Sequence, residues 1–179
     1  MTCRLFFRQR GLTVVDCAVT LAIVSILAGS AAPMAQQVRS RWHLEGAAAQ
    51  LETQLQFARS EAVSRHKPVR VSFASNASQS CYVVHTGKTG ECDCTQPGPS
   101  VCPQGVEQLA LTRYTQAGTV QLSATAKDIG FDGDTGTVTP TTSVTLANVH
   151  GQALKVVVNV VGRVRSCSPS KTVVGHPAC

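Results

Sequence analysis

The stretch "AAAQLETQLQFARSEAVSRHKPVRVSF", residues 47–73, joins a helix pattern directly to a strand pattern. Apolar residues recur here at spacings of three and four with polar side chains between them, which indicates an amphipathic helix. Pro68 predicts the end of this helix, because the residue before a proline avoids helical backbone angles. The valine-rich segment 69–74 predicts a first strand. The stretch therefore predicts an α+β fold in which a helix packs on a sheet. The apolar face of the helix consists of Leu44, Ala48, Leu51, Leu55, Ala58 and Ala62.

An apolar segment precedes this helix. Between residues 12 and 35 the only ionisable side chains are Asp16 and Cys17, and the segment is long enough to cross a bilayer as a helix. Arginines before it predict a cytoplasmic N-terminus and an extracytoplasmic remainder. A cleavable secretory signal peptide is an alternative, but its apolar core is usually shorter. We expect residues 12 to about 66 to form one long helix, bent at Gly29 and Pro33.

The part of the chain after the helix is rich in Val, Thr, Ser and Gly, which indicates short strands and turns. In the last strong candidate strand, alternate residues from Leu154 to Val160 are apolar and lie opposite Lys155 and Asn159. Strands are expected at 69–74, 81–86, 143–149 and 153–161, with weaker candidates at 108–114, 119–123 and 128–131. We expect the Cys- and Pro-rich segment 87–105 to be a surface loop.

Six cysteines follow the apolar segment, and an even set outside the membrane predicts disulfides in an oxidising compartment. The pairing is left open, although a Cys167–Cys179 bond would close a short loop at the C-terminus. Cys81, Cys92, Cys94 and Cys102, with His85 nearby, could instead bind zinc. Their Cys-x-Cys spacing is unusual for zinc, which favours disulfides.

The C-terminal residues 151–179 form a basic tail without a single acid, in a chain of formal net charge +6. Arg163 and Arg165 are two residues apart, so in an extended chain both side chains leave on the same side. Gly162 permits a turn before them. Such a cluster suits phosphate oxygens, although composition alone favours an ordinary solvated strand end. The basic residues of the tail are Lys155, Arg163, Arg165 and Lys171.

Other candidate sites are weak. Three aspartates between residues 128 and 136 could bind calcium, but the EF-hand pattern is absent and Asp-Gly pairs favour turns. Trp42 is expected to be an interfacial anchor or a packing residue. The histidines show no spacing typical of a triad or metal site, and no nucleophile elbow is present. We expect neither an enzyme, nor a cofactor, nor a bound metal ion.

The N-terminal features together resemble the class III signal of type IV pilins and type II secretion pseudopilins. Gly11 ends a basic leader and is followed by Leu12, Thr, two aliphatic residues and Asp16, with Pro33 near the end of the apolar helix. The resemblance implies cleavage after Gly11 by a prepilin peptidase, methylation of Leu12, and pairing of Asp16 with the terminal amine of a neighbouring subunit. The family usually has Phe and Glu where this chain has Leu12 and Asp16.

Two further motifs resemble the FimT/GspH family of minor pilins. They are "ARSEA" with the following proline and valine-rich strand, and "VVVNVVGRVRSC", whose Gly162 to Arg165 match the GRxR element of FimT-type proteins. The resemblance implies the type IV pilin fold, a long N-terminal helix packed on antiparallel sheets. It divides the chain into a leader (1–11), a transmembrane segment (12–35), an amphipathic helix (36–66) and a β-rich head with the basic tail (67–179).

For function, the FimT resemblance implies non-specific DNA binding during natural transformation, through Lys155, Gly162, Arg163, Arg165 and Lys171. The expected partners are the DNA backbone, other pilins, the prepilin peptidase and the inner membrane, from which the protein moves to a pilus, the periplasm or the cell surface. A GspH-like structural pseudopilin of protein secretion is the alternative. A third hypothesis, outside the family, is a periplasmic binding domain on an uncleaved signal anchor.

Overall fold

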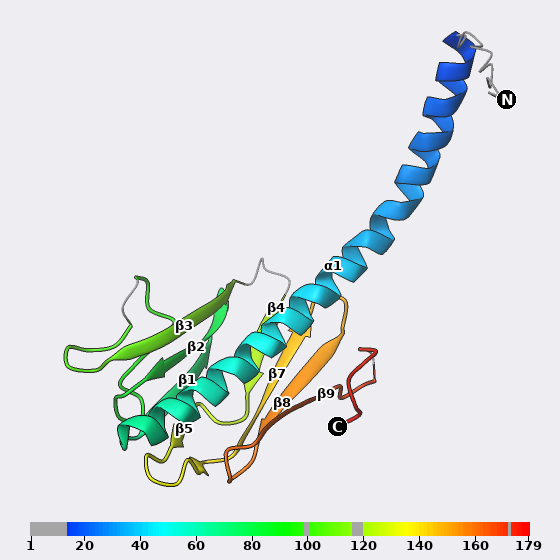
Figure 1. The fold of residues 1–179 in the computed structure, drawn as a ribbon. Helices are drawn as coiled ribbons and strands as arrows, with labels where there is room; N and C mark the ends of the chain where they lie inside the picture. Colours follow the sequence, from blue (N-terminus) through cyan, green and yellow to red (C-terminus); the bar gives the residue numbers. More distant parts are fainter. Residues whose placement is uncertain (1–13, 99–100, 116–119, 172) are drawn as a thin grey trace, which may run out of the picture. The chain divides into compact units, whose positions relative to one another are not determined.

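The computed structural model describes residues 14–98, 101–115, 120–171 and 173–179, without the side chains of 28 and 30–34. One helix, α1 (Val14–Arg65), precedes the strands of this described part (Figure 1). The chain divides into two compact units between Val38 and Arg39, which are described separately below. The strands are β1 (Val69–Ser75), β2 (Gln79–His85), β3 (Gln108–Thr115), β4 (Val120–Ala124), β5 (Asp128–Phe131), β6 (Val138–Thr139), β7 (Thr142–Asn148), β8 (Ala153–Val158) and β9 (Val164–Cys167).

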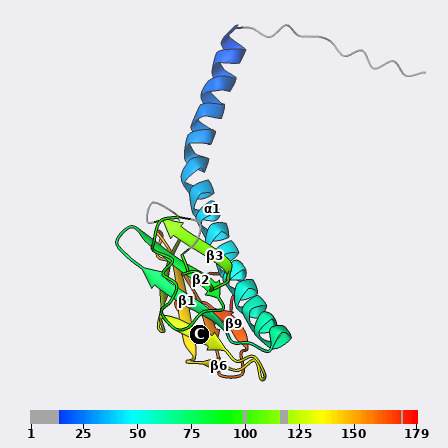
Figure 2. The same cartoon turned by 90° about the vertical axis from the view of Figure 1, so that its left-hand side faces the viewer.

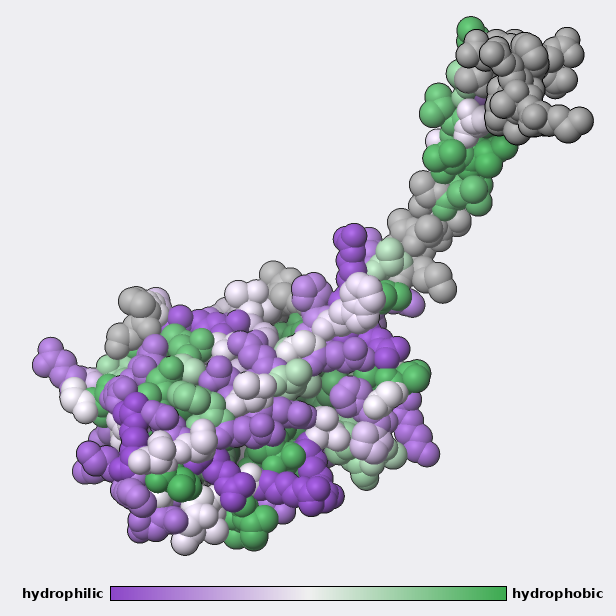
Figure 3. All heavy atoms as spheres, in the orientation of Figure 1, coloured by the Kyte–Doolittle hydropathy of each residue, from purple (hydrophilic) through white to green (hydrophobic). Residues whose placement is uncertain are grey.

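In the N-terminal unit, residues 14–38 are helical and the described apolar side chains are exposed, as Figure 3 shows. Among the described residues, no helical stretch combines the length and the apolar character that crossing a membrane requires. The transmembrane segment expected at 12–35 stays a prediction. Gly11 and Leu12 lie outside the described residues, and so does the side chain of Pro33.

The helix ends where Pro68 predicts. His66 adopts a left-handed φ of 49°, and the Lys67 amide donates to the Ala62 carbonyl at 3.2 Å. A bond from this amide to the carbonyl five residues earlier closes the last turn in the manner of a Schellman cap. Gly133 packs against this end, since a Cβ there would lie 2.5 Å from the Lys67 nitrogen. The turn between β5 and β6 is thereby positioned on the helix terminus.

Two antiparallel sheets make up the C-terminal unit, and the part of α1 after Arg39 lies along them (Figures 1 and 2). The first sheet has the order β3-β2-β1-β5-β6, and the second has the order β4-β7-β8-β9. Every strand expected from the sequence is present. β6 and β9 are not expected, because β6 is very short and β9 is polar. The α+β class and the antiparallel sheets are confirmed.

One large core joins the helix to both sheets. The predicted helix face is fully buried, and it packs on the inward-facing residues of β1, β2, β5, β7 and β8. Side chains alternate between the two faces of a strand, which explains which residues are buried. In β8, Leu154, Val156 and Val158 are buried, and the residues between them face outward. Burial of this apolar surface is the main favourable contribution to folding of this unit. Its largest members are Leu44, Leu51, Leu55, Tyr82, Ile129, Phe131, Leu146 and Leu154.

A second, smaller core lies on the opposite face of the first sheet. Cys81 and Val83 face outward from β2 and are buried by Cys92, Cys94 and Val101 of the following loop. The loop is joined to the sheet by the Cys81–Cys94 disulfide and closed by a Cys92–Cys102 disulfide. The surface loop expected in segment 87–105 is confirmed, and in addition this loop covers the outer face of a sheet.

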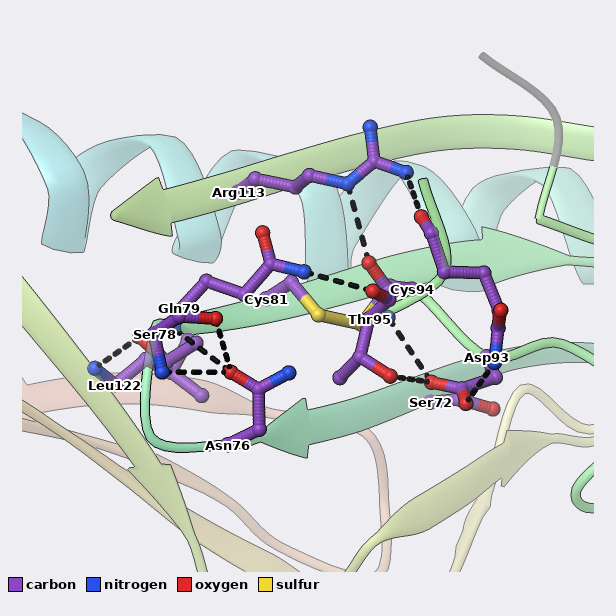
Figure 4. The surroundings of a disulfide bond; sticks show 12 residues. Ser72, Asn76, Ser78, Gln79, Cys81, Asp93, Cys94, Thr95, Arg113 and Leu122 are labelled. Carbon is purple, nitrogen blue, oxygen red and sulfur yellow. Dashed lines mark hydrogen bonds between the residues drawn. A yellow bond between two sulfur atoms is a disulfide. The ribbon is translucent and has the colours of Figure 1, made fainter. Parts of the chain in front are cut away.

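Arg113 of β3 fixes this loop through three carbonyl groups. Its Nε donates to Cys94 at 3.1 Å, and its Nη2 donates to Gln96 and to Gly98, each at 2.9 Å. The Gln79 amide adds a bond to the Thr95 carbonyl at 2.9 Å. Figure 4 shows these side chains converging on the disulfide. A cation bonded to three loop carbonyls holds a segment that has no regular structure of its own.

Candidate functional site

The basic tail begins with a tight turn between β8 and β9. The Arg163 amide donates to the Asn159 side chain at 2.8 Å, and the Gly162 amide donates to the Asn159 carbonyl at 2.9 Å. β8 therefore ends at Val158, and the expectation of a strand to residue 161 is wrong. Val160, expected on the buried face, is 57% exposed. Apolar residues alone do not extend the strand, because Asn159 and Gly162 favour the turn.

Gly162 serves both the turn and the packing of the helix. Its φ of 73° is left-handed, which favours glycine. A Cβ at this position would lie 2.6 Å from the Gly136 carbonyl oxygen and 2.9 Å from Nε of Arg59. Gly136 also has a left-handed φ, and its carbonyl accepts a bond from Arg59 Nε at 3.1 Å. The "ARSEA" and "GRVR" motifs, distant in sequence, therefore meet in space.

An open groove of about 900 Å³ lies over this contact. Its basic residues are Arg59 and Arg163, and its one lining acid among the described residues is Asp134. Asp134 is exposed and lies 3.6 Å from the His66 ring. We call this surface the Arg59 groove. Its lining consists of Gln56, Arg59, Ser60, Val63, Asp134, Thr135, Val161, Gly162, Arg163 and Val164.

Arg165 and Lys155 lie on another face. Arg165 pairs with Val157 and Lys155 pairs with Cys167 in the β8–β9 ladder, so these residues share the outer face of the second sheet. Diagonal neighbours on adjacent antiparallel strands are within reach of each other when the side chains are long. Arg163 directly precedes β9, and the Asn159 amide donates to the Arg163 carbonyl at 3.1 Å. The expectation that the side chains of Arg163 and Arg165 leave on the same side stays a prediction.

The end of the tail is closed by a Cys167–Cys179 disulfide, as expected. It packs on the helix through Arg41, whose Nη2 donates to the Val174 carbonyl at 2.6 Å. Arg41 and Arg59 are 18 residues apart, or roughly 27 Å along a helix. Lys171 is exposed and does not line the Arg59 groove.

The alternative metal sites are not supported by the geometry. The six cysteines beyond the helix form three disulfides, which leaves none of them available as a zinc ligand. Asp132 accepts bonds from the amides of Asp134 and Thr135, at 3.1 and 2.9 Å, so the predicted turn is confirmed. These bonds lower the pKa of the Asp132 carboxyl. Asp128 lies elsewhere, against Arg70 and Ser72.

A chain of hydrogen-bonded polar side chains, formed by His85, Ser72 and Asp128, was not expected from the sequence. The His85 ring is fully buried and its Nε2 lies 2.9 Å from Ser72 Oγ, which donates to Asp128 at 2.6 Å. The Gly87 amide donates to Nδ1 at 3.1 Å, so the neutral ring carries its proton on Nε2. The chain links β1, β2 and β5. Alternation in β2 places His85 on the same face as Cys81, but a single histidine gives no further signal.

Residues 47–162 match the family model described as Type II transport protein GspH. The chain belongs to the GspH family. This membership removes the hypothesis of an unrelated binding domain, and it confirms the resemblance to minor pilins and pseudopilins. The match includes Arg59, Gly136 and Gly162, and therefore the contact on which the Arg59 groove is built.

Solved structures of both kinds of protein resemble this GspH-family chain. The type IV minor pilin FimU of Pseudomonas aeruginosa is 19% identical, with a TM-score of 0.49, over 76% of this chain and 96% of that one. The minor pseudopilin EpsH of the Vibrio cholerae Type 2 Secretion System is 12% identical, with a TM-score of 0.46, over 70% and 97%. No curated protein matches this chain.

Proposed function

We propose that this GspH-family chain is a minor type IV pilin that binds extracellular DNA for natural transformation and takes part in pilus assembly. The observation that carries the proposal is the pair of exposed arginines, Arg163 and Arg165, that flank the end of the second sheet in a tail without acids. Guanidinium groups offer planar pairs of donors that match phosphate oxygens. Lys155 adds a charge beside Arg165.

The chemistry of the tail favours contact with the DNA backbone. Residues 151–179 contain no aromatic side chain, so base stacking has no platform there. Phosphate contacts carry no sequence information, and binding should therefore be non-specific. With three or four such contacts, a fourfold rise in salt should weaken binding by roughly 40- to 150-fold, since each contact contributes a slope of about 0.9.

The test is a titration of the full-length protein, in a non-ionic detergent, with duplexes of two unrelated sequences. The double variant Arg163→Gln/Arg165→Gln should lose affinity for both duplexes and give a salt slope about two contacts smaller. The matched control, Lys88→Gln/Lys127→Gln, removes the same charge from two exposed positions outside the tail. Equal losses in the two variants would show that net charge, and not the tail, causes binding.

A structural role in protein secretion is the second candidate. The family model carries the description of a type II transport protein. Val160 and Val161 at the tip of the β8–β9 turn are 57% and 53% exposed, which suits a contact with another protein. Wild-type protein that does not bind DNA even at low salt would favour this pseudopilin function and contradict the first proposal.

A further inference from the structure

Arg59 in the helix has donors that the fold does not use. Its Nε bonds to the Gly136 carbonyl at 3.1 Å. Neither terminal amino group of its guanidinium has a hydrogen-bonding partner within the described part of the chain. The side chain is half-buried and lines the Arg59 groove. A cation in this position, with four N–H donors left over, is suited to an oxygen-rich anion.

Two glycines hold this guanidinium in place. Built Cβ atoms would lie 3.0 Å from Arg59 Nε at Gly136, and 2.9 Å from Nε and 3.0 Å from Cδ at Gly162. The arginine therefore runs through space that only glycines leave open, and its Nε bond fixes the plane of the group. A donor held in this way loses less side-chain entropy on binding than a mobile surface arginine. The fold presents Arg59 in a preorganised state.

The rest of the groove agrees with an anionic ligand. Arg163 supplies a second guanidinium, while Gln56 and Thr135 are polar neighbours. The Asp134 carboxylate repels an anion, but it is exposed at the groove and faces the His66 ring. The two arginines outnumber this acid, so the local charge is positive. Lys155 and Arg165 continue the positive charge on the neighbouring face.

We propose that the Arg59 groove binds one phosphodiester of the DNA backbone between Arg59 and Arg163, so that the helix contributes a contact of its own to DNA binding. This inference rests on the proposed function and extends it, because Arg59 lies outside the basic tail. Arg59 is the fixed donor and Arg163 is the donor on the turn. Arg165 of the tail then binds a neighbouring phosphate on the same strand.

The test compares Arg59→Gln, Arg163→Gln and their combination in DNA titrations of the full-length protein from 50 to 200 mM salt. Each single variant should bind DNA roughly tenfold more weakly, which is the lower end of the effect of a lost charged hydrogen bond. The salt slope of each single variant should fall by about 0.9. The double variant should lose less than the product of the two losses, because both residues hold one phosphate. Lys127→Gln, an equal loss of charge outside the groove, is the control.

A second measurement separates binding from a structural effect. The Nε–H resonance of Arg59 in the wild-type protein, assigned by its absence in Arg59→Lys, should shift when the duplex is added. If Arg59→Gln does not fold, this shift decides the question. An unshifted resonance, or a weaker Arg59→Gln variant with an unchanged salt slope, would overturn the inference. The inference would also be overturned if Arg59→Gln kept the DNA affinity and the salt slope of the wild type while Arg163→Gln bound DNA more weakly. The proposed function would then stand. Wild-type protein that fails to bind DNA would overturn both.

Discussion

At the scale of single residues, Gly162 combines a backbone conformation with a close contact. We expect Gly162→Ala to lower the free energy of unfolding by about 2 to 4 kcal/mol, since the left-handed φ and the overpacking against Gly136 each cost about 1 to 3 kcal/mol. Gly151→Ala is a matched control, because Gly151 has a φ of 77° with nothing within 4 Å of a built Cβ. Denaturant unfolding measures both. Equal losses would mean that the contact with Gly136 and Arg59 is not tight.

His85 should make the stability depend on pH. Burial lowers the pKa of His85 below its ordinary value of 6.5, against the opposing attraction of the Asp128 carboxylate. The neutral ring is favoured in the folded state, so its contribution is complete above pH 6.5 and is lost as the pH falls through the lower folded-state pKa. We expect the free energy of unfolding to decline between pH 7 and 5. His85→Gln should show a flatter profile over that range, and an equally steep one would contradict the assignment.

Sequence patterns identified some of these residues and not others. Gly162 could be recognised as a turn residue, because a glycine between an apolar segment and basic residues indicates a turn from the local sequence alone. Its contact with Arg59 could not, because it depends on how the β5–β6 and β8–β9 turns pack on the helix. Side-chain contacts between distant segments leave no periodic signal in a single sequence.

At the scale of elements, the covering loop after β2 differs from the tail although both are closed by disulfides. The three bonds have sequence separations of 13, 10 and 12, so each should contribute about 3 kcal/mol by restricting the unfolded chain. Cys81 and Cys94 are also buried in the second core. We expect Cys81→Ala/Cys94→Ala to lower the free energy of unfolding more than Cys167→Ala/Cys179→Ala. Equal losses would mean that the loop adds only chain closure.

The helix and most of the strands were predictable, because the spacing of apolar residues and the positions of proline and glycine indicate where these elements lie. The helix end at Pro68 and every expected strand follow from local patterns. The covering role of segment 87–105 was missed because Pro, Gly and Cys indicate an irregular loop, and irregular loops usually lie on the surface. The apolar content that anchors it, Val101 with three cysteines, is spread too thinly to show a pattern. Disulfides here replace the apolar residues that a regular element would supply.

At the scale of the whole molecule, the C-terminal unit has covered and open surfaces. One face of the first sheet is sealed by the disulfide-bonded loop, and the helix covers the inner faces of both sheets. The outer face of the second sheet and the Arg59 groove remain open, and both carry the basic residues of the tail. A ligand of the C-terminal unit should therefore approach at the β8–β9 end. This arrangement supports DNA binding and a protein contact at Val160 and Val161 alike.

Assembly is the property that involves the whole chain, and Asp16 is the residue on which it should depend. An acid in a membrane helix costs about 2.5 to 3.5 kcal/mol at the centre and less near the end, where Asp16 would lie, and this cost is offset by a positively charged partner. Cleavage after Gly11 would create one, the terminal amine of a neighbouring subunit. We expect Asp16→Ala to reduce the amount of protein in sheared surface filaments, while Asp16→Glu, which keeps the charge, assembles at least as well as wild type. Mass spectrometry of the membrane-bound protein should find methylated Leu12 as the first residue in all three. Normal assembly of Asp16→Ala would contradict the pairing, and Met1 retained on the wild-type protein would contradict the cleavage that creates the amine.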